Sequence, residues 1–323
     1  MAPVTTTARL EICIDDPSSG LGARVLRRLS LDDHVRMVQM PECEVLVWLA
    51  AHDADTRASR GESALAGIMT ALASHRDIRH VVLVSSAMVY GAYANNPVPL
   101  TEESVLRPDP EFAYARQLGA VEQLVDEWRC AEPGRTATVL RPAIAVAADG
   151  SSGLANSLAA GLGQRVGESD PPAQFLHLDD LAAAVALAAE RRLDGVYNVA
   201  PDGWIAGERV RALAGAVPRI KLPERVHEVI TDLRWRFQRG PIPPGLLSYT
   251  RHPWLVANDR LRAEGWEPGV TNEQAYVEGT EAKWWTMVSP KRRQELALGA
   301  MVALGLFVAV AVVRAVRRGA RRG

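Results

Sequence analysis

Short apolar runs rich in Val and Ile alternate with helix-like segments along the first two hundred positions. Amphipathic or alanine-rich stretches lie between most of these runs. This alternation predicts a mostly parallel sheet with helices on both faces, whose ligands bind at the carboxyl ends of the strands. The expected strands cover residues 8–14, 34–39, 44–50, 80–86, 136–142 and 195–200, and the clearest expected helices cover 20–29, 62–75, 114–128 and 179–192.

The pattern changes after Ala200, where proline and glycine become frequent. We expect a small C-terminal lobe, mainly residues 200–280, to complete a domain that spans residues 1–288. One amphipathic stretch in the lobe, residues 224–239, is rich in Arg and aromatic residues. It is predicted to pack against the main domain, although a role at a membrane surface stays open.

From Leu296 to Val313 there is no charged or polar side chain. Eighteen residues of helix would span ~27 Å, close to the hydrocarbon thickness of a bilayer. Arginines follow the run, and basic residues also precede it, as expected for side chains that reach the headgroups. The pattern predicts that residues 289–323 form a single-pass membrane anchor with a basic tail, in contact with lipid. A buried core helix is the alternative interpretation.

The orientation of this expected anchor follows from the other end of the chain. The first residues, MAPVTTTARLEICI, contain no apolar run of signal-peptide length, so we expect the large domain to be cytoplasmic. Three basic residues precede the expected span and five follow it. This difference alone would keep the tail inside, and we rank it below the missing signal.

Composition excludes several classes of function. The chain has 323 residues with a formal net charge of -1, so no global charge favours nucleic acid as a partner. Its three cysteines, Cys13, Cys43 and Cys130, fit a reducing compartment and match no zinc spacing. The sequence is compatible with a homodimer but does not indicate one.

The motifs at the predicted strand ends are more specific. The string HVVLVSSAMVYG (80–91) is followed by YARQLGAVEQL (114–124), and further strings are WLAA (48–51), VLRPA (139–143), FLHLDDLA (175–182) and GVYNVAPDG (195–203). Together, from about Leu10 to about Gly279, they resemble the extended short-chain dehydrogenase/reductase family of the NAD-dependent epimerase/dehydratase type. The resemblance implies a Rossmann-like doubly wound domain, NAD or NADP as cofactor, and a nucleotide sugar or similar hydroxylated substrate.

In that family a Ser or Thr, a Tyr and a Lys perform acid–base catalysis. Ser86 matches the serine and Tyr114 the tyrosine; without a catalytic role they would be a strand-end hydroxyl and a helix-start aromatic. The lysine expected one helical turn after the tyrosine is replaced by Leu118. Arg116 points to another face of the helix, and Gln117 carries no charge. A tyrosine without a cation has a pKa near ~10 and is a poor base at neutral pH.

The phosphate-binding loop departs from the family pattern as well. Only Gly22 falls on a fingerprint glycine, while Asp16 and Ser19 occupy the other two positions and Gly20 would serve in a shifted register. An Asp16 carboxylate would face the pyrophosphate. The cofactor contacts implied by the resemblance are Gly20, Gly22, Ala50, Ala51, Ser85, Tyr114 and Pro142.

Two further departures concern the region around the expected site. Between Leu29 and Val45 there is room for one strand where the family usually has two strands and a helix, and no acidic residue is a convincing ribose ligand. Ile144 stands where the family often has an Asn.

A cluster of His177, Asp179 and Asp180 could suggest a metal site. The resemblance favours a strand-to-helix junction capped by an Asp instead, and no metal is predicted.

Three functional hypotheses follow. The first is a membrane-anchored enzyme that uses NAD(P) with Tyr114 and Ser86. The second is a catalytically impaired relative that keeps the fold as a binding or scaffold protein, favoured by Leu118 and Asp16. The third is a protein that recruits a partner through residues 224–239.

Overall fold

The computed structural model describes residues 9–40, 42–50, 60–149, 153–162, 170–214 and 244–280. The chain divides into two compact units, Met1–Glu281 and Ala282–Gly323. All described residues belong to the first unit.

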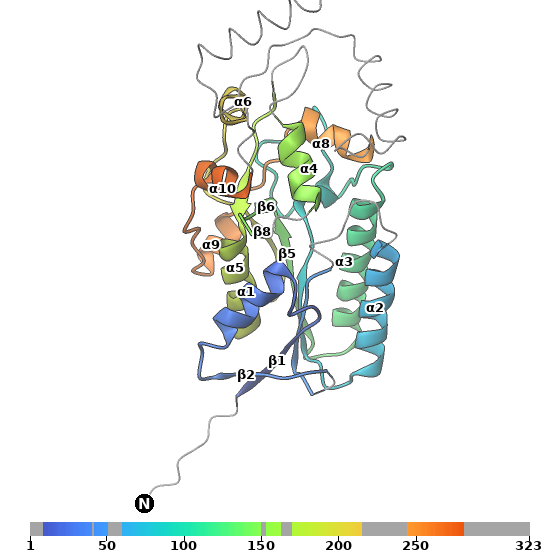
Figure 1. Cartoon of the computed structure of the whole chain (residues 1–323). Coiled ribbons are helices and arrows are strands. Elements are labelled where there is room, and N and C mark those ends of the chain that lie inside the picture. The colour runs from blue at the N-terminus through green and yellow to red at the C-terminus, as the bar shows by residue number, and fades with distance from the viewer. Residues whose placement is uncertain are drawn as a thin grey trace, which may run out of the picture. The chain divides into compact units, whose positions relative to one another are not determined.

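Six parallel strands form the main sheet in the order β2-β1-β3-β4-β5-β8 (Figure 1). Each of them coincides with one of the six runs that the sequence analysis identified as strands, which confirms the predicted parallel α/β sheet. Their bounds are β1 Leu10–Ile14, β2 Val35–Met37, β3 Val45–Trp48, β4 His80–Val84, β5 Thr136–Pro142 and β8 Gly195–Val199.

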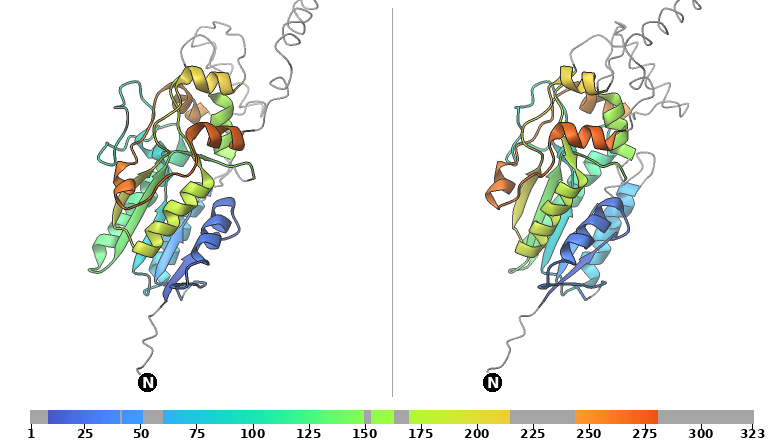
Figure 2. Two further views of the ribbon diagram at one scale, coloured as in Figure 1. Left: turned by 90° about the vertical axis from the view of Figure 1, so that its left-hand side faces the viewer. Right: turned by 60° about the vertical axis from the view of Figure 1, so that its left-hand side comes forward.

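Helices cover both faces of this sheet (Figures 1 and 2). Helices α1 (Gly20–Leu29) and α5 (Leu178–Arg191) pack on one face, and α2 (Arg60–Ser74) and α3 (Ala113–Ala131) on the other. Because side chains alternate along a strand, Val45 and Val47 of β3 join the core beneath α1 and α5. Leu46 joins the core beneath α2 and α3. Both faces are buried, which explains why these strands are continuously apolar.

The lobe lies beyond the carboxyl ends of the strands (Figure 1). A third apolar core holds it together. Within this core the buried Tyr249 donates a hydrogen bond from its hydroxyl to the Met88 carbonyl, 2.8 Å long, which joins the C-terminal part of the lobe to the segment that follows β4. Its elements are η1 Ala87–Tyr90, β6 Ile144–Val146, α4 Gly153–Gly161, β7 Phe175–His177, α6 Gly207–Leu213, η2 Pro244–Leu246, α8 Leu247–Arg251, α9 Asp259–Ala263 and α10 Asn272–Gly279. The parallel pair β6–β7 was not predicted from the sequence.

The connection between β2 and β3 is short, as the sequence indicated. Strand β2 ends at Met37 and β3 begins at Val45, and the described residues between them contain no helix. Strand β2 is therefore the last strand at this edge of the sheet. The Rossmann order 3-2-1-4-5-6 carries one more strand there, and among the described residues that strand, beyond β2, is absent.

The structure corrects the prediction of a transmembrane helix, and with it the membrane localisation and lipid contact. Across the residues that the structure describes, none of the helices is long and apolar enough to cross a membrane. The longest, α3, has 19 residues but carries charged side chains along its length, including Arg116 and Asp126. Residues 296–313 and the stretch 224–239 lie outside the described residues. The inferred membrane orientation loses its basis accordingly.

Candidate functional site

A pocket opens at the carboxyl ends of β4 and β5, where the fold predicts a ligand site. Its volume is about 360 Å³, counting the open space at its mouth. The structure brings four sequence-predicted residues together in its lining: Ser85, Ser86, Tyr114 and Pro142. The remaining lining residues are apolar: Met88, Ala143, Ile144, Ala145, Leu154, Ala155, Leu158 and Trp254. The pocket is thus shared by the main domain and the lobe.

Two hydroxyls of the pocket come from different elements. Ser86 follows β4 and caps η1, where its Oγ accepts a hydrogen bond from the Met88 N–H at 3.2 Å. Tyr114 lies in the first turn of α3, packed against Phe112 with the ring centroids 5.8 Å apart. The catalytic roles that the resemblance assigns to Ser86 and Tyr114 stay predictions.

Leu118 lies one turn after Tyr114 on the inner side of α3. Its side chain is 3% exposed and belongs to the apolar core between the sheet and α2 and α3. All three lysines of the chain lie outside the described residues, so no lysine stands near Tyr114 among those described. The position that would hold an ammonium beside the tyrosine is filled by hydrocarbon.

A buried polar network supports the pocket from below. The Ser85 hydroxyl donates to Glu122 Oε1 at 2.5 Å, and the Glu122 carboxylate binds the Arg141 guanidinium at 2.6 Å. Both partners of this ion pair are only 6% exposed. Arg141 also donates to the Tyr90 hydroxyl at 2.8 Å, which in turn donates to Asn198 Oδ1 at 2.9 Å. The network joins β4, α3, β5 and β8.

The charge of Arg141 is committed to this network. Burial opposes the charged form, but hydrogen bonding and Coulomb attraction from Glu122 outweigh it, so the pKa of Arg141 is raised. Burial also raises the pKa of Tyr90, against the lowering effect of Arg141. Because Glu122 neutralises the guanidinium, Arg141 does not replace the missing lysine as a free cation near Tyr114.

The loop before α1 has a carboxylate, Asp16, where the family resemblance places a glycine that faces the cofactor pyrophosphate. Asp16 Oδ1 accepts hydrogen bonds from the Ser18 N–H at 3.2 Å, the Ser19 N–H at 3.1 Å and the Ser18 hydroxyl at 2.7 Å. Backbone N–H groups at such a turn are the donors that bind phosphate in dinucleotide sites. In this loop the Asp16 carboxylate accepts from two such groups, the N–H groups of Ser18 and Ser19.

Gly22 is required by this loop geometry. A Cβ at position 22 would lie 1.9 Å from the Asp16 carbonyl oxygen, which no side chain can tolerate. Ser19 caps α1 by accepting from the Gly22 N–H at 3.0 Å, and Gly20 begins the helix. Ala50 follows β3 with a left-handed backbone, φ +46°. Ala51 lies outside the described residues.

These observations test whether NAD or NADP fits the described residues. Two backbone donors of the loop, the N–H groups of Ser18 and Ser19, are occupied by Asp16, and among the described residues no strand lies beyond β2. On these two grounds the described residues do not fit a dinucleotide bound in the manner of the family.

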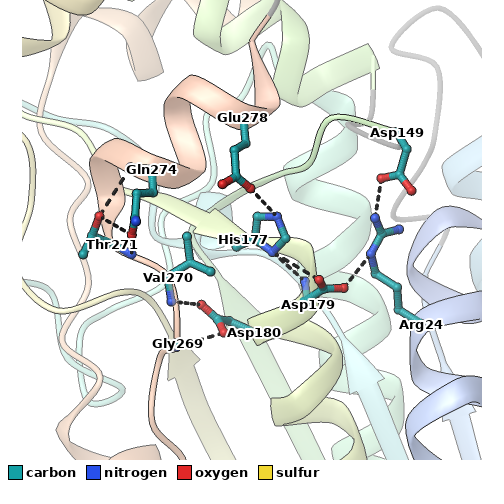
Figure 3. Close-up of polar contacts among 10 residues, drawn as sticks. All are labelled: Arg24, Asp149, His177, Asp179, Asp180, Gly269, Val270, Thr271, Gln274 and Glu278. Atoms are coloured by element: carbon teal, nitrogen blue, oxygen red, sulfur yellow. Dashed lines mark hydrogen bonds and ion pairs between the residues drawn. The ribbon is translucent and has the colours of Figure 1, made fainter.

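The cluster around His177 ties three helices together (Figure 3). His177 caps α5, its Nδ1 accepting from the Asp179 N–H at 3.2 Å, while its Nε2 lies 3.4 Å from Glu278 of α10. Arg24 of α1 donates to Asp179 at 2.8 Å and also binds Asp149. The strand-to-helix junction is as expected, but the cap is His177 and not an Asp.

Asp180 has a different structural role. Its carboxylate accepts from the N–H groups of Gly269 and Val270, each at 3.0 Å, and thereby fixes the segment that leads into α10. Across the described ranges, no group of three or more His, Cys, Asp and Glu is arranged to hold a metal ion.

Three residues of the site were not identified from the sequence: Glu122, Arg141 and Trp254. A signal existed for Glu122: it stands four residues after Leu118 and eight after Tyr114, on the helix face that the apolar residues mark as buried. A carboxylate on a buried face needs a cation, and Arg141 at the end of β5 supplies it. Nothing in the sequence indicated that Trp254 would reach this pocket.

The fold and the pocket define a Rossmann-type α/β protein with a small-molecule pocket at its strand ends. A family model described as "NAD dependent epimerase/dehydratase family" matches residues 25–200, and the chain belongs to that family. An uncharacterized protein of Mycobacterium bovis and one of Mycobacterium tuberculosis are each 26% identical over 200 residues, 62% of this chain and 53% of theirs. The chain thus spans about half the length of these curated relatives.

Solved structures share the fold at low sequence identity. UDP-glucose 4-epimerase from Thermotoga maritima with UDP-glucose matches with a TM-score of 0.58 and 16% identity, over 84% of this chain and 97% of that one. RMD from Pseudomonas aeruginosa, complexed with NADPH, matches with a TM-score of 0.57 and 19% identity, over 83% and 97%. dTDP-glucose 4,6-dehydratase from Bacillus anthracis, in complex with NAD, matches with a TM-score of 0.57 and 13% identity, over 84% and 95%.

Proposed function

We propose that this chain is a small-molecule-binding member of its family that has lost the family's hydride-transfer chemistry. The observation that carries the proposal is Leu118, buried in the apolar core one turn after Tyr114. The pocket around Ser86 and Tyr114 is retained, so a ligand with a hydroxyl or carbonyl oxygen can still be bound there.

The proposed loss of acid–base catalysis follows from the missing positive charge beside Tyr114. A cation next to a tyrosine favours its ionised form and brings its pKa toward neutrality. Hydrocarbon at position 118 gives no such help, and Arg141 is neutralised by Glu122. Positioned acid–base catalysis contributes roughly 10²–10⁴-fold to a rate, so its loss would remove most turnover. The occupied loop at Asp16 supports the same conclusion for cofactor binding.

The second candidate is an NAD(P)-dependent enzyme acting on a nucleotide sugar or a similar hydroxylated substrate. It is favoured by the presence of Ser86 and Tyr114 in one pocket and by the fold shared with nucleotide-sugar enzymes. In this alternative, Tyr114 would exchange the proton of a substrate hydroxyl while Ser86 holds the same oxygen.

One experiment separates the two candidates. The purified full-length protein is denatured and the released small molecules are identified by mass spectrometry, while a second sample is assayed for NADH or NADPH oxidation with carbonyl compounds. We expect no stoichiometric cofactor and no turnover. Co-purified NAD(P), together with a hydride-dependent reaction that Tyr114→Phe abolishes, would establish the enzyme instead.

The binding function itself is tested by thermal shift against a panel of small hydroxyl and carbonyl compounds. A compound that stabilises the protein should do so less in Ser86→Ala and in Tyr114→Phe, because each variant removes one pocket hydroxyl. Full stabilisation in both variants would place the binding elsewhere and refute the proposal.

A further inference from the structure

The polar and the apolar side chains of the pocket come mainly from different secondary-structure elements. Its side-chain hydroxyls come from the end of β4 and the start of α3. The rest of the lining comes mainly from the β5–β6 segment, from α4 and from Trp254, and these described side chains are hydrocarbon or indole. A ligand in this pocket would therefore meet hydrogen-bonding side chains from two elements only.

The hydrogen-bonding capacity of the described lining is smaller than its polar residues suggest. The hydroxyl proton of Ser85 is already donated to Glu122. The indole N–H of Trp254, a side chain 9% exposed, is donated to the Tyr249 carbonyl at 3.0 Å, so this residue offers a ligand only its ring. The Ser86 oxygen accepts from the Met88 N–H, which leaves the Ser86 proton as a donor.

A sugar ring fits such a lining poorly. A hexose carries oxygen on almost every carbon, and each hydroxyl buried without a partner weakens binding by roughly fivefold to a hundredfold. Ile144, 5% exposed, presents only a hydrocarbon side chain to the pocket. A flat or cyclic hydrocarbon would instead be buried favourably against Ile144, Leu158 and Trp254.

We infer that the ligand of this pocket is a mainly apolar ketone or alcohol whose one oxygen lies at Ser86 and Tyr114, and not a nucleotide sugar. The inference rests on the proposed binding function and specifies its ligand class. A single oxygen matches the small number of polar side chains, and the hydrocarbon body matches the mainly apolar lining.

The test uses the full chain and isothermal titration calorimetry with two probes: 1-tetralone, a bicyclic ketone, and UDP-glucose. We expect 1-tetralone to bind and UDP-glucose not to bind at millimolar concentration. Ser86→Ala should weaken 1-tetralone about tenfold by removing the donor. Ile144→Asn should weaken it by a similar factor, since it places an amide against the hydrocarbon.

Val277→Asn is the matched control, because Val277 is exposed on α10 and outside the pocket lining; it should leave the affinity for 1-tetralone unchanged. Ser86→Ala keeps the test valid should Ile144→Asn fail to fold. If UDP-glucose binds and Ser86→Ala weakens it, while 1-tetralone does not bind, the ligand class is wrong and the binding function stands. If Ser86→Ala changes the affinity for neither probe, both the proposed ligand class and the proposed binding function are overturned.

Discussion

Asp16 should act as an internal competitor for any phosphate that approaches the start of α1. Two substitutions separate the effect of the Asp16 charge from the effect of its hydrogen bonds. Asp16→Asn keeps an oxygen that can accept from the Ser18 and Ser19 N–H groups but removes the charge, whereas Asp16→Gly removes both. We therefore expect the affinity for NADH to increase in the order unmodified protein, Asp16→Asn, Asp16→Gly.

The magnitude follows from the geometry of the loop. A phosphate bound to the same N–H groups would lie within about 4 Å of the carboxylate, where repulsion per unit charge is about 1 kcal/mol in water and about 4 kcal/mol at a protein surface. Asp16 is exposed, so solvent screening favours the lower part of this range. A gain of about 1.4 kcal/mol corresponds to a tenfold tighter complex for Asp16→Asn. Asp16→Gly should exceed it, because two backbone donors are also released.

The assay is a fluorescence titration of NADH into the full-length protein and its variants. Asp126→Asn provides the matched control, since it removes one carboxylate from an exposed position on α3 far along the chain from the loop. The reasoning is refuted if the unmodified protein binds NADH in the micromolar range, or if neither Asp16 variant binds more tightly than the Asp126→Asn control.

Three further predictions concern stability and catalysis. Burial raises the pKa of Asp15 from 3.8 to about 6, so the stability linked to this proton is complete below pH ~4 and is lost as the pH rises through about 6. The fall in unfolding free energy between pH ~4.5 and pH ~7.5, measured by urea denaturation, should therefore be smaller for Asp15→Asn than for the unmodified protein, by about 2 kcal/mol. Glu122→Gln leaves the Arg141 charge buried without its partner and should destabilise the fold by about 3–5 kcal/mol in urea denaturation, whereas Glu273→Gln, in an exposed pair, should leave the midpoint unchanged. Leu118→Lys should lower the unfolding free energy by about 3 kcal/mol or more, because it places an ammonium in the apolar core, whereas Leu118→Met should lower it by less than about 1.5 kcal/mol. Leu118→Lys should not create NADH oxidation, and NADH turnover in this variant would contradict the separate defect proposed at the Asp16 loop.

The sequence predicted the main sheet well because its strands are buried on both faces. Continuous apolar runs of this kind leave little ambiguity, and the helices between them have clear amphipathic or alanine-rich patterns. Strand β6 was missed because it has three residues and follows β5 after a single residue, and β7, with three residues, was expected only as the start of a strand-to-helix junction. Their pairing depends on contacts between residues 144–146 and 175–177, which no local pattern reveals.

The candidate site was predicted in part. Motif spacing was sufficient for Ser86 and Tyr114 to be placed at strand and helix ends that meet. The hydrogen bonding of the loop before α1 could not be predicted to the same degree. The sequence showed a carboxylate at Asp16 where glycine was expected, but only the structure shows that it binds the loop's own N–H groups. Side-chain hydrogen bonds of this kind depend on backbone angles that composition does not specify.

The network of Ser85, Glu122, Arg141 and Tyr90 has a consequence for the energetics of binding. Its donors and acceptors are paired within the protein, so the base of the pocket keeps its shape without a ligand to complete it. A preorganised base means that little side-chain entropy is lost when a ligand arrives, and more of the contact energy then appears as affinity. The same rigidity means that the residues above the network can be substituted while the cavity keeps its form.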